Sequence, residues 1–320
     1  MKQIKFWALS IFAISLLLVS CGETVDESLV LAEYVESAES PLDPTSINKL
    51  VPASELQQLV AAGNPYIIDI RRDEYNSIGH IDGAVQVAAT EVLGHLETIN
   101  IDDYDKVVIA CYSGQTAAYY TTLANLAGYE VYSLAFGMSS WNAATAGPWN
   151  NGVSNMYATQ LETEANDKAA EGGMPVLETG FEGGADILDA RVTAVSDEGF
   201  DAGKISAATV WDSPEDYYIV NYWPVENYNL GHIPGAIQYT PNASMLTTAD
   251  IKTLPVDQTI VVYCYTGQGS AFLSAYLRVL GYDAKSLLFG INGMATDWAA
   301  DNGLTSWGEG KISDYALVTE

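Results

Sequence analysis

The stretch that decides the fold is Lys106-Val107-Val108-Ile109-Ala110-Cys111-Tyr112-Ser113-Gly114-Gln115-Thr116. It begins with a short apolar run rich in β-branched residues, which is typical of a buried strand. The uncharged run from Thr116 to Ala127 that follows has the length of a helix, and Gly128 supplies the left-handed position that often ends one. A strand that enters a helix through a short loop is the building unit of a parallel sheet.

The same pattern recurs 153 residues further along the chain. A predicted strand from Thr259 to Tyr263 leads into Cys264-Tyr265-Thr266-Gly267-Gln268-Gly269, and a predicted helix follows from Ser270 to Leu280. Three more pairs of segments repeat in the same order: Gly79–Ala84 with Gly231–Ala236, Gly128–Tyr129 with Gly281–Tyr282, and Phe136–Gly137 with Phe289–Gly290. A repeat of this length indicates duplicated domains, because the repeats of solenoid proteins are far shorter.

Each half also contains predicted strands on either side of this unit. They run from Tyr66 to Ile70 and from Glu130 to Leu134 in the first half, and from Tyr217 to Asn221 and from Asp283 to Leu287 in the second. Short strands that alternate with helices predict an α/β fold, with a mainly parallel sheet flanked by helices in each domain.

The N-terminus has the pattern of an export signal. Lys2 and Lys5 precede an uncharged run from Phe6 to Ser20, which is too short to span a membrane comfortably but fits the core of a signal peptide. The run ends in Leu18-Val19-Ser20-Cys21-Gly22, which resembles the lipobox of bacterial lipoproteins. This resemblance implies lipidation of Cys21, and the glycine after it fits sorting to the outer membrane of a diderm bacterium. We therefore expect a lipid-anchored protein of the cell envelope, with an ordinary secretory signal as the alternative.

The predicted signal peptide covers residues 1–20, and the rest of the chain divides into four segments. Residues 21–45 are acidic, contain Ser and Pro and show little apolar periodicity, so we expect a flexible tether. Residues 151–185 are rich in Gly, Asn, Glu and Ala and are interpreted as an interdomain linker, partly helical between Ala158 and Ala170. The two domains are predicted to span residues 46–150 and 186–320.

The composition is strongly acidic, with 13 basic and 41 acidic residues and a net charge of −28. Removal of the signal peptide takes away two lysines and leaves a net charge of −30. Nucleic acid is therefore not an expected partner, because phosphate binding needs clustered Lys and Arg. The charge itself is typical of a solvated acidic surface that keeps a protein soluble.

The chain has three cysteines, Cys21, Cys111 and Cys264. If Cys21 carries lipid, the other two do not amount to the disulfide framework that small exported domains use, although a single bridge between them stays open. The sequence has no CxxC motif and no pair of histidines at a metal-ligand spacing, so we expect no metal site and no cofactor.

Both cysteine loops place a thiol where a parallel sheet meets the N-terminus of a helix. The loop residues are Tyr112, Ser113, Gly114, Gln115 and Thr116 in the first domain and Tyr265, Thr266, Gly267, Gln268 and Gly269 in the second. Small residues let the backbone curl, so that its amide groups point inward toward an anion. We therefore expect these loops to bind a charged substrate and to lower the pKa of Cys111 and of Cys264.

These loops, together with Asp69-Ile70-Arg71 and the two Gly-His-Ile-x-Gly-Ala segments, resemble the rhodanese, or sulfurtransferase, family over a domain-sized stretch of each half. The resemblance implies two rhodanese-like domains and a ping-pong reaction. Cys111 and Cys264 would be the nucleophiles, which take sulfane sulfur from thiosulfate, a polysulfide or a persulfide and pass it as a persulfide to a thiol acceptor. The backbone amides of the loops would hold the charge.

Neither loop has the arginine that the family often places at its sixth position, where this chain has Thr116 and Gly269. Together with the acidic composition, this departure favours a polysulfide, a low-molecular-weight persulfide or a protein persulfide over the thiosulfate dianion. The related phosphatases end a longer loop with an arginine where this chain has Ala117 and Ser270, so phosphate-ester chemistry is disfavoured.

The two predicted sites differ in the residues that support the loop. Asp69 and Arg71 occupy the positions at which the family braces the fold near the loop with a buried ion pair. The second domain has Asn221 and Trp223 there. Replacement of both partners by neutral groups can be nearly neutral for stability, so the second domain is expected to fold.

Cys111 is therefore expected to be the better-equipped site. Positive charge near it would come from Arg71 or Arg72, although the preferred role of Arg71 is structural. Cys264 is interpreted as an active thiol, a relay for sulfur or a remnant. Two alternatives to an enzyme remain: a non-catalytic rhodanese-like binding or sulfur-sensing module of an envelope complex, and a redox protein in which Cys111 and Cys264 form a reversible disulfide.

The remaining candidates are histidines and tyrosines. His80 and His232 are expected to be structural, because each sits in a repeated turn segment, and His95 is expected on the surface. Tyr112 and Tyr265 are candidates for walls of the substrate pocket.

Overall fold

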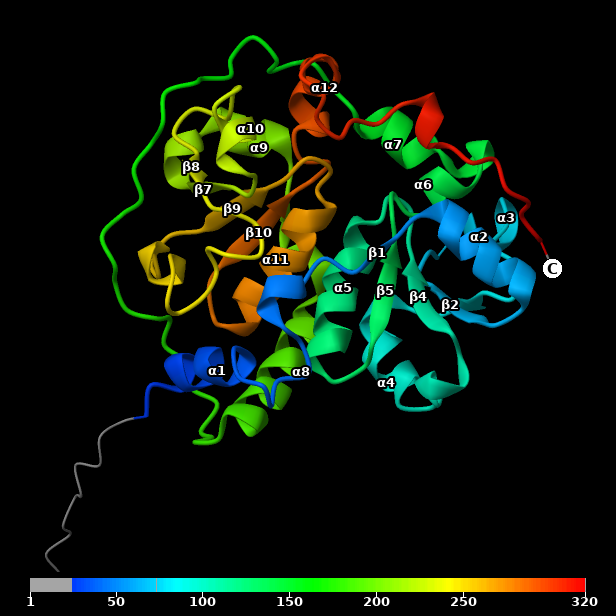
Figure 1. The fold of residues 1–320 in the computed structure, drawn as a ribbon, viewed down its shortest axis with the longest axis horizontal. Helices are drawn as coiled ribbons and strands as arrows, with labels where there is room; N and C mark the ends of the chain where they lie inside the picture. Colours follow the sequence, from blue (N-terminus) through cyan, green and yellow to red (C-terminus); the bar gives the residue numbers. More distant parts are fainter. Residues whose placement is uncertain (1–24, 73, 320) are drawn as a thin grey trace, which may run out of the picture.

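The computed structural model describes residues 25–72 and 74–319 (Figure 1). The predicted signal peptide and the predicted lipidation site at Cys21 lie outside the described residues. Within these ranges, none of the helices combines the length and the hydropathy that a membrane span requires.

Each half of the chain forms a parallel five-stranded sheet. The strands of the first are β1 (Leu50–Val51), β2 (Pro65–Asp69), β3 (Val85–Gln86), β4 (Lys106–Ala110) and β5 (Val131–Leu134), in the order β1-β5-β4-β2-β3. The strands of the second are β6 (Lys204–Ile205), β7 (Tyr218–Asn221), β8 (Ile237–Gln238), β9 (Ile260–Tyr263) and β10 (Ala284–Leu287), in the order β6-β10-β9-β7-β8. The matching orders and the parallel pairing of every neighbour confirm the predicted α/β class and the duplication.

Helices cover these sheets. They are α1 (Glu27–Val35), α2 (Ala53–Ala62), α3 (Glu74–Ser77), α4 (Val92–Leu96), α5 (Gln115–Leu126), α6 (Met138–Trp141), α7 (Gly147–Gly152), α8 (Gly184–Ala202), α9 (Ala207–Asp212), α10 (Val225–Tyr228), α11 (Gln268–Val279) and α12 (Asn292–Asp301). The predicted strands and the two helices after the cysteines agree with the structure to within two residues at each end.

Helices α5 and α11, one from each domain, pack against each other at the centre of the molecule (Figure 1). The Thr122 hydroxyl of α5 donates a hydrogen bond of 3.1 Å to the carbonyl of Phe272 in α11. Buried side chains of both helices belong to one continuous hydrophobic core. The low charge of both helical runs follows from this position, because a helix between two domains has little face left for solvent.

The prediction of a flexible tether over residues 21–45 is wrong for the part that the structure describes. Helix α1 packs against α8, and Leu31, Ala32 and Val35 are fully buried. The Ser28 hydroxyl donates a 2.9 Å hydrogen bond to the carbonyl of Leu280 at the end of α11. These four α1 residues have the i, i+3, i+4, i+7 spacing of a single helix face, which is the periodicity that the acidic composition obscured.

The predicted linker also differs from its expected form. Residues 153–183 contain no helix, so the helix expected between Ala158 and Ala170 is absent. The segment instead runs around the outside of the second domain (Figure 1). Glu162 and His232 exchange two backbone hydrogen bonds of 2.9 Å, so this part of the linker is an arm held by the second domain.

The C-terminal segment returns to the first domain, which corrects the boundary that assigned all of residues 186–320 to the second. Val318 and His80 exchange two backbone hydrogen bonds of 2.9 Å. The Trp141 indole donates to the carbonyl of Ala316 at 2.9 Å. Each Gly-His-Ile segment thus pairs with an arm, and the arm of the first domain comes from the far end of the chain.

Candidate active site

Cys111 lies at the carboxyl edge of the first sheet, directly after β4 and before α5. Gly114 has a φ of +85°, which turns the loop into the helix. The amide N–H groups of Gly114 and Ala117 point at the Cys111 sulfur, with N···Sγ distances of 3.1 and 3.3 Å. The predicted arrangement of inward-pointing amides below a helix N-terminus is therefore present at this thiol.

Cys264 occupies the matching position after β9, but its sulfur has different partners. The amide of Ser270 lies 3.2 Å from Sγ, and the Ser270 hydroxyl lies 3.7 Å from it. That hydroxyl is also 2.8 Å from the hydroxyl of Ser286. Ser270 stands where the first domain has Ala117, so the second thiol has a hydroxyl neighbour that the first lacks.

The expected lowering of the thiol pKa is wrong for Cys111. Burial raises the pKa of Cys111, and the nearby charge of Asp69 adds to this effect. The amides of Ala117, Ser113 and Gly114 oppose the rise without reversing it. The sequence indicates the amides, but the extent of burial depends on packing by residues that are distant in the chain.

A cavity of about 470 Å³ opens at Cys111 between the two domains. Its walls from the first domain include Tyr112 and Thr116 beside the thiol. The wall from the second domain is the segment from Glu198 to Lys204 around the end of α8. Gly199 has a φ of +71° and breaks the helix there, so that Phe200 and the residues after it turn across the mouth of the site.

Charges of both signs surround this cavity. Arg72 and Lys204 provide positive charge, and Glu198 and Asp201 provide negative charge. Lys204 pairs with Asp201, and a hydrogen bond from Lys204 lowers the pKa of Asp201, with smaller help from the charges of Lys204 and Arg72. The lining of the cavity is therefore balanced in charge, two cations against two carboxylates, although the whole chain is strongly acidic; Glu198 also pairs with Arg278 outside the lining.

The sequence correctly suggested Arg72 as a cation near Cys111 but gave no sign of Lys204. No motif marks Lys204, which stands at the start of β6 in the other domain. The packing of α8 against α5 and against Ala89–Glu91 of the first domain brings Lys204, which follows α8, to the cavity.

The surroundings of Cys264 are aromatic, although Cys264 itself is slightly more exposed than Cys111, at 5% against 2%. Tyr222 stands at the position of Ile70, which lines the first cavity, and its hydroxyl accepts a 2.9 Å hydrogen bond from the amide of Asn242. Tyr222 is only 3% exposed. A side-chain carbon on Gly269 would lie 3.6 Å from Oδ1 of Asn48, so a residue of the first domain borders the second loop.

The ion pair between Asp69 and Arg71 is present and buried. Nη2 of Arg71 lies 2.6 Å from Oδ2 of Asp69, with both side chains at most 1% exposed. Nη2 also donates to the carbonyl of Gly79 at 2.9 Å. The guanidinium thus ties the end of β2 to the Gly-His-Ile turn, which is the structural role that the sequence favoured.

The second domain uses neutral groups at the same place. Asn221 Nδ2 donates to the Tyr263 hydroxyl at 2.8 Å, and that hydroxyl accepts a further bond from the amide of Ile233 at 3.2 Å. Trp223 is fully buried and stacks on Tyr265, with ring centroids 5.0 Å apart. Aromatic packing and amide hydrogen bonds therefore replace the ion pair.

The two repeated histidines have equivalent structural contacts. His80 stacks on Tyr75 and His232 on Tyr228, with ring centroids 3.8 and 3.7 Å apart. Nδ1 of each imidazole lies within 3.1 Å of the backbone carbonyl of the same tyrosine. These contacts agree with the prediction of structural histidines bonded to backbone at a turn.

The loop side chains separate into two groups. Tyr112 and Thr116 line the Cys111 cavity, and the Tyr112 hydroxyl accepts a bond from the amide of Arg72 at 3.3 Å. Tyr265 is held by Trp223 and by a hydrogen bond from Asn227.

The remaining side chains of interest are Gln115 and Gln268, which were expected in the substrate-binding loops. Each instead reaches the opposite domain.

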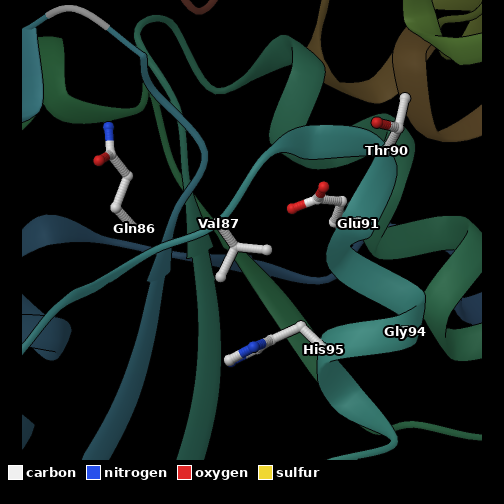
Figure 2. Close-up of a pocket in the computed structure, with 6 residues that line it drawn as sticks. All are labelled: Gln86, Val87, Thr90, Glu91, Gly94 and His95. Carbon is white, nitrogen blue, oxygen red and sulfur yellow. The ribbon is translucent and has the colours of Figure 1, made fainter.

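A second cavity, of about 390 Å³, lies beside the first and shares Thr90 with it (Figure 2). Glu91 and His95 extend into it from the same helical segment. His95, expected on the surface, is half-buried, and its Nε2 lies 2.8 Å from the Tyr66 hydroxyl. Within residues 25–72 and 74–319, no group of three or more His, Cys, Asp or Glu side chains is placed to hold a metal ion.

Fold and site together define a tandem α/β protein with a thiol on an amide-lined loop in each domain. The family model of the rhodanese-like domain matches residues 52–144 and again residues 176–300. The chain therefore belongs to the rhodanese-like family, with two copies of the domain. This confirms the family resemblance of the sequence and the expected repeat.

The chain is similar to curated relatives over one domain or less. A thiosulfate sulfurtransferase of Shewanella oneidensis is 37% identical over 102 residues, which are 31% of this chain and 96% of that protein. A tRNA sulfurtransferase of Desulfurococcus amylolyticus is 36% identical over 78 residues, which are 24% of this chain. Those residues span only 15% of that relative's length.

Solved structures resemble the chain over both domains at low identity. A thiosulfate sulfurtransferase from Pseudomonas aeruginosa is 19% identical, with a TM-score of 0.31, and the match covers 88% of this chain and 48% of that one. A 3-mercaptopyruvate sulfurtransferase from Escherichia coli is 16% identical, with a TM-score of 0.27 and coverage of 82% and 100%.

Proposed function

We propose that this protein is a sulfurtransferase or sulfur carrier in which Cys111 holds sulfane sulfur as a persulfide. The observation that carries the proposal is the Cys111 sulfur itself, which faces a cavity of about 470 Å³ while two backbone amides point at it. Membership of the rhodanese-like family supports the same chemistry. Amides aimed at a sulfur stabilise the anionic forms that a thiol and its persulfide pass through.

The proposed transfer conserves atoms and charge. The Cys111 thiolate attacks the outer sulfur of a donor persulfide, a new S–S bond forms, and the S–S bond of the donor breaks. The donor leaves as a thiolate and takes up the proton that the cysteine released. A thiolate acceptor then attacks the outer sulfur on Cys111: a new S–S bond forms on the acceptor, the S–S bond at Cys111 breaks, and Cys111 leaves as a thiolate. No net oxidation occurs, so the transfer needs no oxidant or reductant.

The charge balance of the cavity supports a donor of low net charge. Arg72 and Lys204 are offset by Glu198 and Asp201, so a dianion such as thiosulfate gains little net attraction there. A low-molecular-weight persulfide or a protein persulfide fits this cavity better. We therefore propose a persulfide as the physiological donor and a thiol as the acceptor.

The proposed location is the cell envelope, with the chain anchored through lipid on Cys21. The support is the lipobox-like sequence before that cysteine. Helix α1 begins at Glu27, so at ~3.5 Å per residue the anchor would lie within roughly 20 Å of the folded part. The protein would therefore sit close to the membrane surface. Replacement of Cys21 by Ser should release the protein from membranes and remove labelling by a fatty-acid probe.

Mass spectrometry of the purified chain tests the proposed chemistry. After incubation with glutathione persulfide, with polysulfide or with thiosulfate, the peptide that contains Cys111 should gain one sulfur atom. A thiol acceptor should then remove that sulfur. Failure of every donor to load Cys111 would overturn the proposal and favour a non-catalytic binding module.

A further inference from the structure

Gln268 reaches from the second cysteine loop into the first domain. Its Oε1 accepts a 2.7 Å hydrogen bond from the backbone amide of Phe136, while its Nε2 donates to the hydroxyl of Thr266 at 3.0 Å. The side chain is only 1% exposed. One buried amide group therefore connects the Cys264 loop with a turn of the other domain.

Gln115 makes the reciprocal connection from the first loop. Its Oε1 accepts a 2.7 Å hydrogen bond from the amide of Phe289, and its Nε2 donates to the hydroxyl of Ser113 at 3.0 Å. It is also only 1% exposed. The same pair of hydrogen bonds thus occurs twice, once in each direction across the domain interface.

The two contacted turns press directly on the cysteine loops. Phe136 has a φ of +60°, and Gly137 follows it with the same φ. A side-chain carbon on Gly137 would lie 2.5 Å from the carbonyl oxygen of Cys111, and the amide of Met138 donates to that oxygen at 2.8 Å. A displacement of this turn therefore displaces the backbone of the Cys111 loop.

The second turn has the same relation to the second loop. Phe289 has a φ of +61° and is followed by Gly290, where a side-chain carbon would overlap the carbonyl of Cys264. The amide of Ile291 donates to that carbonyl at 3.0 Å. Continuous contacts thus run from the Cys264 loop through Gln268 to the Cys111 loop, and back through Gln115.

The glutamines also fill the space between the loops. A side-chain carbon on Gly114 would lie 2.5 Å from Oε1 of Gln268, and one on Gly267 would overlap Gln115. Gly114 is one of the two residues whose amides point at the Cys111 sulfur. The two loops therefore have little room to move independently of each other.

We propose that Gln115 and Gln268 are positioning residues that couple the two cysteine sites, each holding the amide loop of the opposite domain in place. Gln268 would set the geometry around Cys111, and Gln115 that around Cys264. A neutral amide is suited to this task because it accepts from one domain and donates to the other without burying a charge. The functional consequence for sulfur transfer rests on the proposed function, but the coupling itself can be tested with the thiols alone.

The experiment measures alkylation of each cysteine by iodoacetamide in the full chain, as a function of pH and by peptide mass spectrometry. Gln268→Met keeps the size of the side chain and removes its hydrogen bonds. We expect the midpoint of the pH profile of Cys111, in the other domain, to rise by about half a unit because its amide loop loosens. Gln115→Met should shift the profile of Cys264 in the same way.

Thr122→Val is the matched control. It removes a buried hydrogen bond between the same two helices, from Thr122 to the carbonyl of Phe272, and leaves both glutamines intact. Its pH profiles should equal those of the unmodified chain. The coupling is refuted if Gln268→Met leaves the Cys111 profile unchanged, or if Thr122→Val shifts it equally.

A second measurement uses the chain without substitutions, before and after alkylation, and does not depend on the variants folding. After selective alkylation of Cys264, amide hydrogen exchange in the peptide 111–116 should change at least twofold in rate. Unchanged exchange would also overturn the coupling. Neither measurement involves a sulfur donor. A negative result here would therefore refute the coupling without bearing on the proposed sulfur transfer, and a failure of sulfur loading would not refute the coupling.

Discussion

The two cysteine loops share one backbone geometry but have different side chains around them. Gly114 and Gly267 have φ values of +85° and +76°, and the Phe-Gly turns behind the loops agree to within a few degrees. The thiols nevertheless differ: two amides point at the Cys111 sulfur, whereas an amide and a hydroxyl lie near that of Cys264.

In this duplicated site the backbone is alike in both domains, and the side chains around the thiols differ. The loop and its supporting turn have the same backbone geometry in both domains. The walls have changed: Tyr222 stands in place of Ile70, and Gly269 in place of Thr116. An open, charge-lined cavity lies at one thiol, and packed aromatic groups lie at the other. The proposed loading by a soluble donor is therefore expected at the first domain, and this expectation can be tested.

The largest expected effect is the loss of sulfur loading in Cys111→Ser. Since the open cavity belongs to Cys111, this variant should lose at least 90% of the persulfide formed with glutathione persulfide, an effect of roughly tenfold or more in rate. Cys264→Ser should retain most of it. Peptide mass spectrometry after timed quenching measures both. Equal losses in the two variants would show that the sites act as one and would remove the asymmetry.

The second prediction concerns the brace of each loop. Asp69→Asn removes the close charge partner of the buried Arg71 and leaves only Glu74, at 4.0 Å, so it should lower the free energy of unfolding by about 3 kcal/mol. Asn221→Leu leaves the Tyr263 hydroxyl without one bond and should cost about 1–2 kcal/mol. Urea denaturation followed by circular dichroism measures both.

The double variant Asp69→Asn, Arg71→Met is the control for that comparison. Because it removes both charges, it should recover part of the stability that Asp69→Asn loses. If the double variant has a lower free energy of unfolding than Asp69→Asn, the ion pair stabilises the fold in itself. The loss in Asp69→Asn would then not come only from leaving one charge unpaired.

The third prediction follows from the raised pKa of Cys111. Burial raises the pKa of this thiol, and the thiolate is the nucleophile, so alkylation of Cys111 should be slower at pH 7 than that of a cysteine in a short peptide. The rate should rise with pH and level off above a pH of about 8.5, which is the midpoint of the pH profile for a cysteine in a short peptide. A midpoint for Cys111 below that value would mean that the loop amides outweigh burial.

The sequence predicted the repeat, the parallel sheets and the positions of both thiols, because these depend on local periodicity and on motifs that occur twice. It did not predict the arms, since the pairing of Val318 with His80 joins positions that only the tertiary fold brings together. Helix α1 was detectable from the spacing of Ser28, Leu31, Ala32 and Val35. The acidic composition of the segment favoured a disordered tether instead.

The smallest expected effect is on donor selectivity, and it tests the cavity that distinguishes the two sites. Lys204→Gln removes one positive charge beside Cys111 while Asp201 and Glu198 remain, so the mouth becomes net negative. Loading from thiosulfate should fall by about threefold at low salt, and less at higher ionic strength, because the side chain is partly exposed to solvent. Loading from a persulfide of low net charge should change less.

Lys106→Gln, at the opposite end of β4 from the thiol, is the control and should affect the loading from neither donor. Equal losses for both donors in Lys204→Gln would mean that this lysine shapes the cavity and does not select by charge.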